Sequence, residues 1–359
     1  MARRPMLMRR ARTLLVAWRG QQLVLINYRT RVSASAEPDA VRILHFFQSW
    51  KPPADLFAFL PEFSPSSLRA GIRQLQENSF LVVKGTRDAE RDAGLERAWA
   101  DWLPHGSFHF ATKDTPFLSA AQAARLMKRY VAESPQALRA KSYPRAPRIA
   151  LPPAGVAGDA FVNVLMARKT HREYFGSISL GAISKLLYYT WGVTGSIEAP
   201  PFGRLLHKTS PSGGARHPGE VYLLAMRVEG LSQGLYHYDG VRHRLERLRS
   251  VPAKKKAVSY AAGQEFLKDA AAVFLMTAVF PRTMWKYRFA RAYRVVLLDA
   301  GHLCQTFCLV ATWLGLAPFC TAALKDSEIE KDLGIDGVRE SALYLAAVGV
   351  PVGKLASSR

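Results

Sequence analysis

The sequence predicts a mixed helix-and-strand protein built in two parts. Near the start, apolar runs on either side of a glycine turn are typical of a β-hairpin, and short amphipathic segments follow it. Residues 134–155 hold five prolines and show little periodicity, as linkers do. Helical and strand patterns alternate after that point. We therefore expect an N-terminal domain over 1–125, a linker over 126–155 and a larger domain over 156–359.

The N-terminal domain is expected to be a small winged-helix-like module with the element order β-β-α-α-α-β. Its hairpin spans Leu14–Tyr28, where Gly20 favours a tight turn between Arg19 and Gln21. An acidic start suits the dipole of the first helix, and a serine-proline pair opens the third. The predicted helices begin at Glu37-Pro38-Asp39, Asp55 and Ser64-Pro65-Ser66, with Pro52-Pro53 ending the first, Asp55 capping the second and a last strand at Phe80–Val83.

Three functions remain open for this module, which resembles the PqqD-like precursor-recognition modules of peptide-modifying enzymes. It could dock a peptide as an added strand on the hairpin. It could read DNA with the helix Ser66–Gln76, which carries Arg69 and Arg73. It could also have a purely structural role, as a lid or a dimerisation element.

Residues Trp99–Lys113 form an extension of this domain that is rich in aromatic residues and histidine. His105 and His109 are four apart, but Pro104 and Gly106 argue against a helix there. We therefore expect no metal pair, and we expect the segment to pack against the following domain.

The second half contains the elements of a large core. Val295–Leu316 is a long apolar stretch, but it carries Asp299, His302 and Gln305, which are costly in lipid. We expect a buried core helix there and not a membrane span. The other expected elements are a helix at Leu180–Trp191, strands at Glu220–Val228, Ala270–Phe280 and Ala342–Val350, and a hairpin over Tyr236–Leu248 that turns at Asp239-Gly240.

The formal charge of +22 favours phosphates, acidic peptides and nucleic acids by long-range attraction. We expect a solvated basic surface with one anion site, and nucleic-acid binding is the less favoured role. The N-terminus resembles a transit peptide in composition only, and no signal-peptide h-region follows, which favours a cytoplasmic protein. Eight arginines fall in the first 32 residues: Arg3, Arg4, Arg9, Arg10, Arg12, Arg19, Arg29 and Arg31.

Only three cysteines occur, Cys304, Cys308 and Cys320. A sparse, odd number gives no disulfide framework and fits a reducing compartment. Cys304 and Cys308 stand four apart in an apolar run, and His302 alone does not complete a set of metal ligands. We therefore expect buried core thiols and no metal.

A cluster of cations near residue 170 is the first candidate for a ligand site. Arg168, Lys169 and Arg172 surround the hydroxyl of Thr170, and a phosphate monoester needs charge together with several converging donors. On a helical turn, Arg168 and Arg172 would share one face. A solvated basic surface is the alternative.

A glycine pair, Gly213-Gly214, marks the second candidate. Because they lack Cβ atoms, the two glycines let backbone amides approach a flat ligand closely, and Ser212 and Arg216 add donors. The run Ser210–Pro218 fits a simple surface turn as well.

Two lysines complete the candidates. Lys286 precedes Tyr287 among further cations, and neighbouring positive charge can lower the pKa of a lysine enough for a general base, with the tyrosine as a proton relay. An exposed basic loop explains this stretch equally well. Lys354, just beyond the last strand, could close a phosphate site or be a solvated terminal lysine.

Taken together, these motifs resemble the nitroreductase family and, within it, the SagB/McbC-type (ThcOx-like) azoline dehydrogenases. The similarity covers about Val156–Lys354, and Trp99–Lys113 looks like the N-terminal extension of the SagB type. The most telling runs are Ser-Pro-Ser-Gly-Gly-Ala-Arg-His-Pro at 210–218, Gly-Leu-Tyr-His-Tyr-Asp at 234–239, Arg-Ala-Tyr-Arg at 291–294 with Asp-Ala-Gly-His at 299–302, and Val-Gly-Val-Pro at 348–351.

The resemblance implies an α+β, nitroreductase-like FMN-binding fold, with a mostly antiparallel sheet between helices, and a homodimer with FMN at the interface. The Lys286-Tyr287 pair matches the pair that azoline dehydrogenases require. The resemblance further implies that Arg168, Lys169, Thr170 and Arg172 hold the FMN phosphate, that Pro211, Ser212, Gly213 and Gly214 lie along the isoalloxazine ring beside Arg216, and that Thr321, Ala322 and Ala323 face its N5 edge.

The function implied is oxidation of peptide thiazolines or oxazolines to azoles in the biosynthesis of ribosomal peptide natural products. An azoline-containing peptide would be the substrate, and a complex with a YcaO-type cyclodehydratase would fit this role. The first rival is an NAD(P)H-dependent nitroreductase or flavin reductase, which Ala322 weakens because many such enzymes have glutamate there. The second rival is a basic winged-helix protein that binds nucleic acid.

Overall fold

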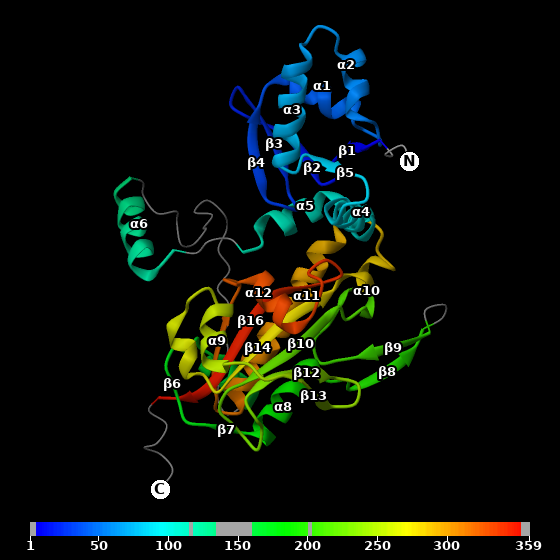
Figure 1. Ribbon diagram of the computed structural model, residues 1–359. Coiled ribbons are helices and arrows are strands. Elements are labelled where there is room, and N and C mark those ends of the chain that lie inside the picture. The colour runs from blue at the N-terminus through cyan, green and yellow to red at the C-terminus, as the bar shows by residue number, and fades with distance from the viewer. Residues whose placement is uncertain (1–4, 115–117, 134–159, 200–202, 353–359) are drawn as a thin grey trace, which may run out of the picture. The chain divides into compact units, whose positions relative to one another are not determined.

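The computed structural model describes residues 5–114, 118–133, 160–199 and 203–352 (Figure 1). The chain forms two compact units: the first comprises Met1–Lys113 with Phe280–Val295, and the second comprises Asp114–Val279 with Val296–Arg359. The predicted linker falls mostly outside the described residues, and a helix, α6 (Ala120–Glu133), occupies its first part. The predicted domain boundaries therefore stay a prediction.

The first unit contains the expected hairpin and two strands that the sequence did not predict. The hairpin pairs Arg19 with Gln22, and Gly20 adopts a φ of +62° between them. The additional strands are poor in β-branched residues, one being Met-Arg-Arg and the other Val-Ser-Ala-Ser-Ala, so their signal is weak. The strands are β1 (Met8–Arg10), which pairs with β5 (Leu81–Val83), and the antiparallel meander β2 (Leu14–Arg19), β3 (Gln22–Asn27) and β4 (Val32–Ala36).

The three expected helices are α1 (Pro38–Phe46), α2 (Leu56–Phe59) and α3 (Pro65–Glu77). Ser64 caps α3, since its hydroxyl accepts the backbone N–H of Ser67 at 3.2 Å. Two details of the prediction are wrong: Asp55 makes no capping hydrogen bond, and α1 ends well before Pro52-Pro53. The helix ends early because the carbonyl of Phe47 accepts the backbone N–H of Arg10 at 2.7 Å, which ties the chain to β1.

The aromatic extension forms two helices, α4 (Arg87–Trp99) and α5 (Leu103–Thr112), so the expectation that Pro104 and Gly106 prevent a helix is wrong. Pro104 stands in the first turn, where a missing N–H costs nothing. Gly106 lies so close to Trp99 that a Cβ would come 3.0 Å from the indole. The extension therefore packs tightly, and its Trp99 and Trp102 rings contact Phe280 of α10 (Phe280–Met284).

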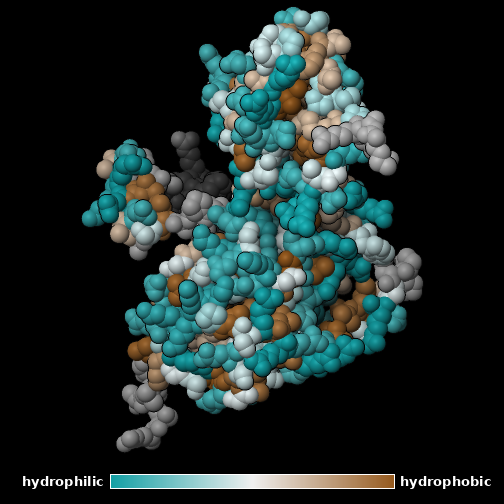
Figure 2. Space-filling view, in the orientation of Figure 1, coloured by the Kyte–Doolittle hydropathy of each residue, from teal (hydrophilic) through white to brown (hydrophobic). Residues whose placement is uncertain are grey.

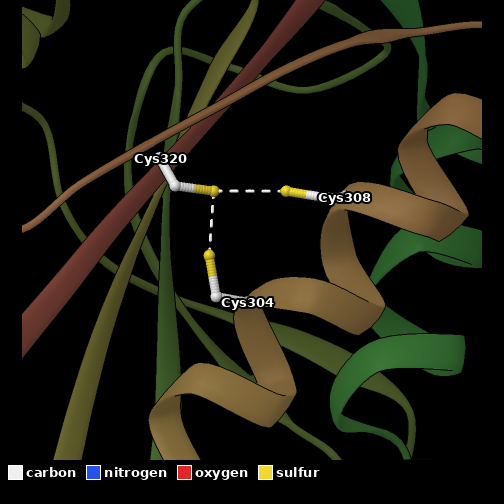
Figure 3. A group of neighbouring side chains, drawn as sticks. All are labelled: Cys304, Cys308 and Cys320. Atoms are coloured by element: carbon white, nitrogen blue, oxygen red, sulfur yellow. Dashed lines mark hydrogen bonds between the residues drawn. The ribbon is translucent and has the colours of Figure 1, made fainter. Parts of the chain in front are cut away.

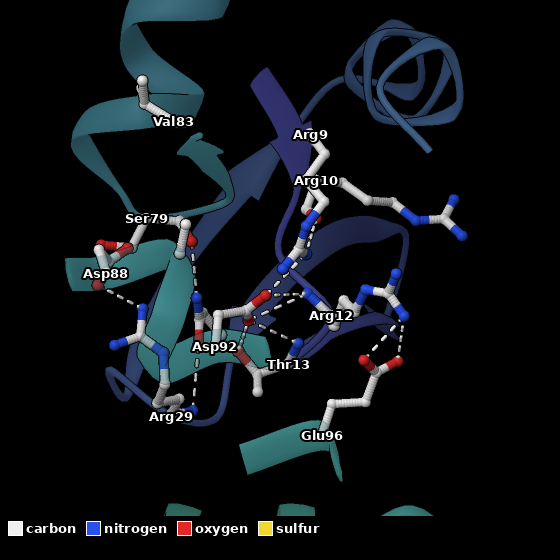
Figure 4. Close-up of polar contacts among 12 residues, drawn as sticks. Arg9, Arg10, Arg12, Thr13, Arg29, Ser79, Val83, Asp88, Asp92 and Glu96 are labelled. Atoms are coloured by element: carbon white, nitrogen blue, oxygen red, sulfur yellow. Dashed lines mark hydrogen bonds and ion pairs between the residues drawn. The ribbon is translucent and has the colours of Figure 1, made fainter. Parts of the chain in front are cut away.

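A buried carboxylate on α4 joins three parts of the first unit (Figure 4). Asp92 is fully buried and forms an ion pair with the buried Arg9 at 2.8 Å. It also accepts hydrogen bonds from the backbone N–H of Arg12 and from the hydroxyl of Thr13, at 3.0 and 2.9 Å. The segment Arg9–Thr13 is thus held by charge as well as by apolar packing.

The second unit is built around an antiparallel sheet of seven strands, which confirms the expected mostly antiparallel fold. Each of its strand pairs is antiparallel. The strands in order are β13 (Arg244–Arg249), β12 (Gly234–Asp239), β10 (Gly219–Ala225), β14 (Ala272–Val279), β16 (Glu340–Pro351) and β15 (Ala317–Thr321), with β6 (Tyr174–Phe175) paired to the end of β16.

Helices cover both faces of this sheet, and each face has its own apolar core. Successive residues of β10 alternate between them: Leu223 packs towards α8 (Leu180–Trp191) and α11 (Ala292–Trp313), and Leu224 packs towards α9 (Ala253–Tyr260) and α12 (Asp326–Leu333). The remaining elements are α7 (Ala160–Ala167), the parallel pair β7 (Ile178–Ser179) and β11 (Val228–Glu229), and the hairpin β8 (Gly195–Glu198) and β9 (Arg204–His207).

The long helix α11 is only partly buried. By length and composition alone, α11 is long and apolar enough to cross a membrane, and it is the one helix among the described residues that passes this test. Phe307 and Ala311 on one side have no exposed surface, whereas Leu298 and Trp313 are more than half exposed. On the face of the molecule shown in Figure 2, hydrophobic side chains interrupt a mostly hydrophilic surface.

Candidate functional site

The cation cluster lies on an extended segment beside the edge strand β15. No helix forms between Arg168 and Arg172, so the expected helical turn is wrong. The reason is that the backbone N–H of His171 donates to the carbonyl of Pro318 at 2.9 Å, which draws the segment along the sheet. Tyr174 anchors its far end, with its hydroxyl donating to the carbonyl of His171 at 3.1 Å.

Glycine in β16 makes this anchoring possible. A Cβ at Gly349 would come 2.8 Å from the ring of Tyr174, so only glycine lets the tyrosine lie flat against the strand. The Val-Gly-Val-Pro run that the sequence singled out therefore has a packing role: it fixes the segment that carries the cations.

Among the described residues, no acid forms an ion pair with the cations of this segment. Arg168 is half-buried, Lys169 and Arg172 are exposed, and within the described ranges no carboxylate forms an ion pair with any of them. The guanidinium of Arg172 stacks 5.7 Å above the ring of Phe319. Burial and then the charge of Lys169 lower the pKa of His171. The segment, with the hydroxyl of Thr170, is thus suited to an anion such as a phosphate monoester.

The glycine loop is held by a buried carboxylate of α11. The Ser212 hydroxyl donates to Asp299 at 2.6 Å, and the backbone N–H of Gly213 donates to the other carboxylate oxygen at 3.3 Å. The same Ser212 oxygen accepts the backbone N–H of His217 at 2.9 Å. Asp299 is 5% exposed, and this burial raises its pKa. The sequence marked Asp299 as part of the Asp-Ala-Gly-His run and as a carboxylate inside an apolar helix, but it did not indicate that Asp299 holds the glycine loop.

The backbone of this loop is strained in the way that ligand clamps often are. Gly214, Ala215 and His217 all adopt left-handed conformations, with φ of 60°, 54° and 43°. Glycine adopts this conformation without cost, but alanine and histidine do not. Arg216 is fixed by its own Nε, which donates to the carbonyl of Gly214 at 3.0 Å. Pro211, at the start of the loop, is exposed.

The predicted N5-facing segment continues directly from β15. Thr321 is the last residue of the strand, and its hydroxyl accepts the backbone N–H of Ala323 at 3.0 Å and the side-chain amide of Gln264 at 3.2 Å. These bonds fix the turn that contains Ala322. The structure therefore places the cation segment and residues 321–323 along the same strand.

The predicted Lys286-Tyr287 pair belongs to the first unit, and its position relative to the other segments stays a prediction. Both backbone N–H groups donate to the carbonyl of Thr283, at 3.2 and 3.0 Å. The carbonyl of Tyr287 accepts the indole N–H of the fully buried Trp102 at 3.1 Å, and Lys286 Nζ lies 5.4 Å from the tyrosine ring centroid. The pair is thus held by the aromatic extension. Lys354 lies outside the described residues.

The fold and these segments agree with a family assignment. The model of the nitroreductase family matches residues 165–350, which contain the cation segment, the glycine loop and residues 321–323. The chain belongs to the nitroreductase family. It is therefore an oxidoreductase by family, and the resemblance drawn from the sequence motifs is confirmed at this level.

Three known proteins are similar to this chain over part or most of its length. The trifolitoxin-processing protein TfxB of Rhizobium leguminosarum bv. trifolii is 27% identical over 309 residues, covering 80% of this chain and 81% of that protein. A Methanocaldococcus jannaschii protein described as a nitroreductase is 34% identical over 188 residues, covering 52% and 89%. The microcin B17-processing protein McbC of Escherichia coli is 29% identical over 164 residues, covering 44% and 57%.

Among solved structures, a chain of the E. coli microcin synthetase McbBCD complex with truncated pro-MccB17 bound shares the fold. The TM-score is 0.51 at 22% identity, covering 72% of this chain and 97% of that one. At this identity the match describes the fold alone.

Proposed function

We propose that this protein is an FMN-dependent dehydrogenase that oxidises thiazoline or oxazoline rings of a ribosomally made peptide to the aromatic azoles. The observation that carries the proposal is the 309-residue similarity to a toxin-processing protein. That similarity is longer than the nitroreductase domain at 165–350, so it extends to sequence outside the flavoprotein fold. A shared peptide-processing role explains why it extends so far.

The unpaired cations and the strained glycine loop fit FMN. Arg168, Lys169 and Arg172 would hold the phosphate because no acid competes for them in the described part of the chain. Asp299 would keep the Ser212–Gly214 loop in the shape that accepts a flat ring. Once bound, FMN would supply a two-electron acceptor.

Lys286 would take a proton from the azoline ring, at the carbon next to its C=N and carbonyl groups. Tyr287 would position that proton or relay it. Trp102 would act as a positioning residue, since its indole N–H holds the backbone of Tyr287. Loss of two hydrogens gives an aromatic ring, which makes the reaction favourable.

Exposed apolar helices support a homodimer as the working form. Phe161, Leu165 and Met166 of α7 are 62%, 42% and 75% exposed, and Leu298 and Trp313 of α11 are 61% and 53% exposed. Such residues gather where subunits meet. Sedimentation of the purified protein as a flavin-loaded monomer would contradict this.

The first unit offers a place for the substrate peptide. A groove of about 770 Å³ lies between β4, an outer strand of its three-stranded sheet, and α3. Ala34 and Ala36 line one side, and Gln74 and Asn78 line the other. An outer strand has free backbone groups to which an extended peptide can add. Binding of duplex DNA but no precursor peptide would instead favour the DNA-reading role.

The decisive experiment incubates the purified, FMN-loaded protein with a synthetic azoline-containing peptide and follows the loss of two hydrogens by mass spectrometry. Lys286→Ala should retain the flavin absorbance and abolish azole formation. Arg288→Ala, which removes an exposed cation two residues away, is the matched control and should react as the wild type does. A Lys286→Ala enzyme with normal turnover would end the assignment of the base.

An NAD(P)H-dependent nitroreductase or flavin reductase is the second candidate, favoured by the 34% identity to the M. jannaschii protein. Steady NADPH oxidation with a nitroaromatic acceptor, together with inert azoline peptides, would establish it in place of the first.

A further inference from the structure

The three cysteines of the chain meet in the second unit (Figure 3). Cys304 and Cys308 lie one turn apart on the same face of α11, and Cys320 points at them from β15. The sulfur of Cys320 lies 2.8 Å from that of Cys304 and 3.4 Å from that of Cys308, and all three lie within 4.8 Å of one another. A helix and a strand thus bring three ligand atoms to one point.

Apolar packing alone does not account for this arrangement. Buried thiols that serve as small hydrophobic groups rest at ordinary contact distances of about 3.5–4.0 Å. Here two sulfur–sulfur distances fall below that range. The three sulfur atoms thus lie close enough together to contact one bound cation.

We propose that Cys304, Cys308 and Cys320 form a binding site for one soft, thiophilic metal cation of the copper(I) type. Thiolates select such cations. Structural zinc would need a fourth ligand, and the cluster found among the described residues consists of these three cysteines, while His302 on the same helix is exposed. Three-coordinate binding is therefore the geometry that this cluster fits.

The site needs only a small adjustment. With a metal–sulfur bond of about 2.3 Å, three sulfurs in a trigonal plane stand about 4 Å apart, so Cys304 and Cys320 would separate by roughly 1 Å. Cys320 is half-buried, which leaves the metal a route of entry. This inference does not rest on the proposed flavin chemistry.

The test is an anaerobic titration of the reduced, full-length protein with copper(I), in competition with a coloured copper(I) chelator. We expect one equivalent to bind with a sulfur-to-copper charge-transfer absorption in the near ultraviolet. Cys308→Ser should abolish both signals. His302→Ala is the matched control, because it removes a metal-binding side chain from the same helix but not from the cluster, and it should bind as the wild type does.

Two results would overturn the site: no stoichiometric binding, or equal binding by the triple serine variant. A disulfide between two of the cysteines in the protein as isolated would also exclude it. If the serine variants fail to fold, alkylation of the wild type answers the question. Copper(I) should protect all three thiols from iodoacetamide, as mapped by mass spectrometry, and unprotected thiols would contradict the proposal.

Discussion

The N-terminal unit and the segment at 168–172 both concentrate positive charge, but only in the first do described carboxylates form ion pairs with some of the cations. In the first unit Arg9 pairs with Asp92, Arg12 with Glu96 and Arg29 with Asp88, all three acids coming from α4. At 168–172 three cations lie together and no described carboxylate pairs with them. Arginines that are already paired stabilise a fold, whereas unpaired ones keep their binding capacity for a ligand.

The comparison shows why charge clusters in a sequence are ambiguous. The N-terminal arginines resembled a transit peptide in composition, yet within the described residues Arg9 and Arg12 hold β1 and the residues just after it to a helix that begins at residue 87. The cluster at 168–172 looked no more specific. Only the positions of the acids distinguish a structural set from a ligand-binding one.

The largest effect on the free energy of unfolding is expected when the buried ion pair between Arg9 and Asp92 is broken. Asp92→Asn leaves the Arg9 charge buried without its partner, which costs about 3–5 kcal/mol. The free energy of unfolding from urea denaturation should fall by that amount. Glu96→Gln removes only the partly exposed partner of Arg12 and should cost less than about 1 kcal/mol. Equal effects of the two substitutions would contradict the structural role of the buried pair.

Removing one of the cations proposed to hold the FMN phosphate should lower the affinity for FMN and leave the free energy of unfolding unchanged. Arg172→Ala should weaken FMN binding about 10–100-fold, as expected for a charge-assisted hydrogen bond of about 1.5–3 kcal/mol. Binding of riboflavin, which lacks the phosphate, should not change, and flavin fluorescence titration measures both. Arg242→Ala, which removes an arginine already paired with Asp239, is the control. An equal loss of affinity for riboflavin would contradict the proposal that Arg172 binds the phosphate.

Two histidines, one in each unit, differ in pKa because their surroundings differ. His109 is buried beside Tyr293 without a carboxylate, and burial lowers its pKa to about 3. His237 lies between Glu220 and Glu246, at 3.0 and 3.1 Å, and the hydrogen bond to Glu220 is the main cause that raises its pKa from 6.5 to about 8. The same side chain is therefore neutral in one unit and charged in the other.

The smallest expected effect is the contribution of His237 to the pH dependence of the free energy of unfolding. Because its pKa is higher in the folded state than in the unfolded state, its stabilisation is fully present below pH 6.5 and is lost as the pH rises through about 8. The side chain is partly exposed, so we expect roughly 1 kcal/mol. Urea denaturation across this window should show the decrease in the wild type and a smaller one in His237→Gln. Identical pH profiles would refute the assignment.

Local patterns predicted many of the elements correctly. The hairpin at Leu14–Tyr28, the helix Leu180–Trp191 and the buried strand at 272–279 have strong periodicity or turn residues that need no distant partner. Errors arose where a distant contact decided the outcome. Strand β1 exists because it pairs with β5, some seventy residues away, and α5 tolerates Gly106 because Trp99 packs on it.

The candidate site was predicted unevenly for the same reason. The cations and glycines were visible as motifs, but Asp299, which organises the glycine loop, stands 86 residues from Gly213. The thiol cluster was missed because Cys320 lies 12 residues beyond Cys308, with nothing in the sequence to indicate that β15 turns back along α11.

By itself, the sequence determined the element types, the family resemblance and the residues that carry charge, sulfur and glycine. These follow from side-chain chemistry and from periodicities that extend over a few residues. Only the tertiary structure decided which cations are paired, which carboxylate holds the loop and which thiols meet. Such choices depend on distances of a few ångströms between residues far apart in the chain, and the sequence does not encode those distances locally.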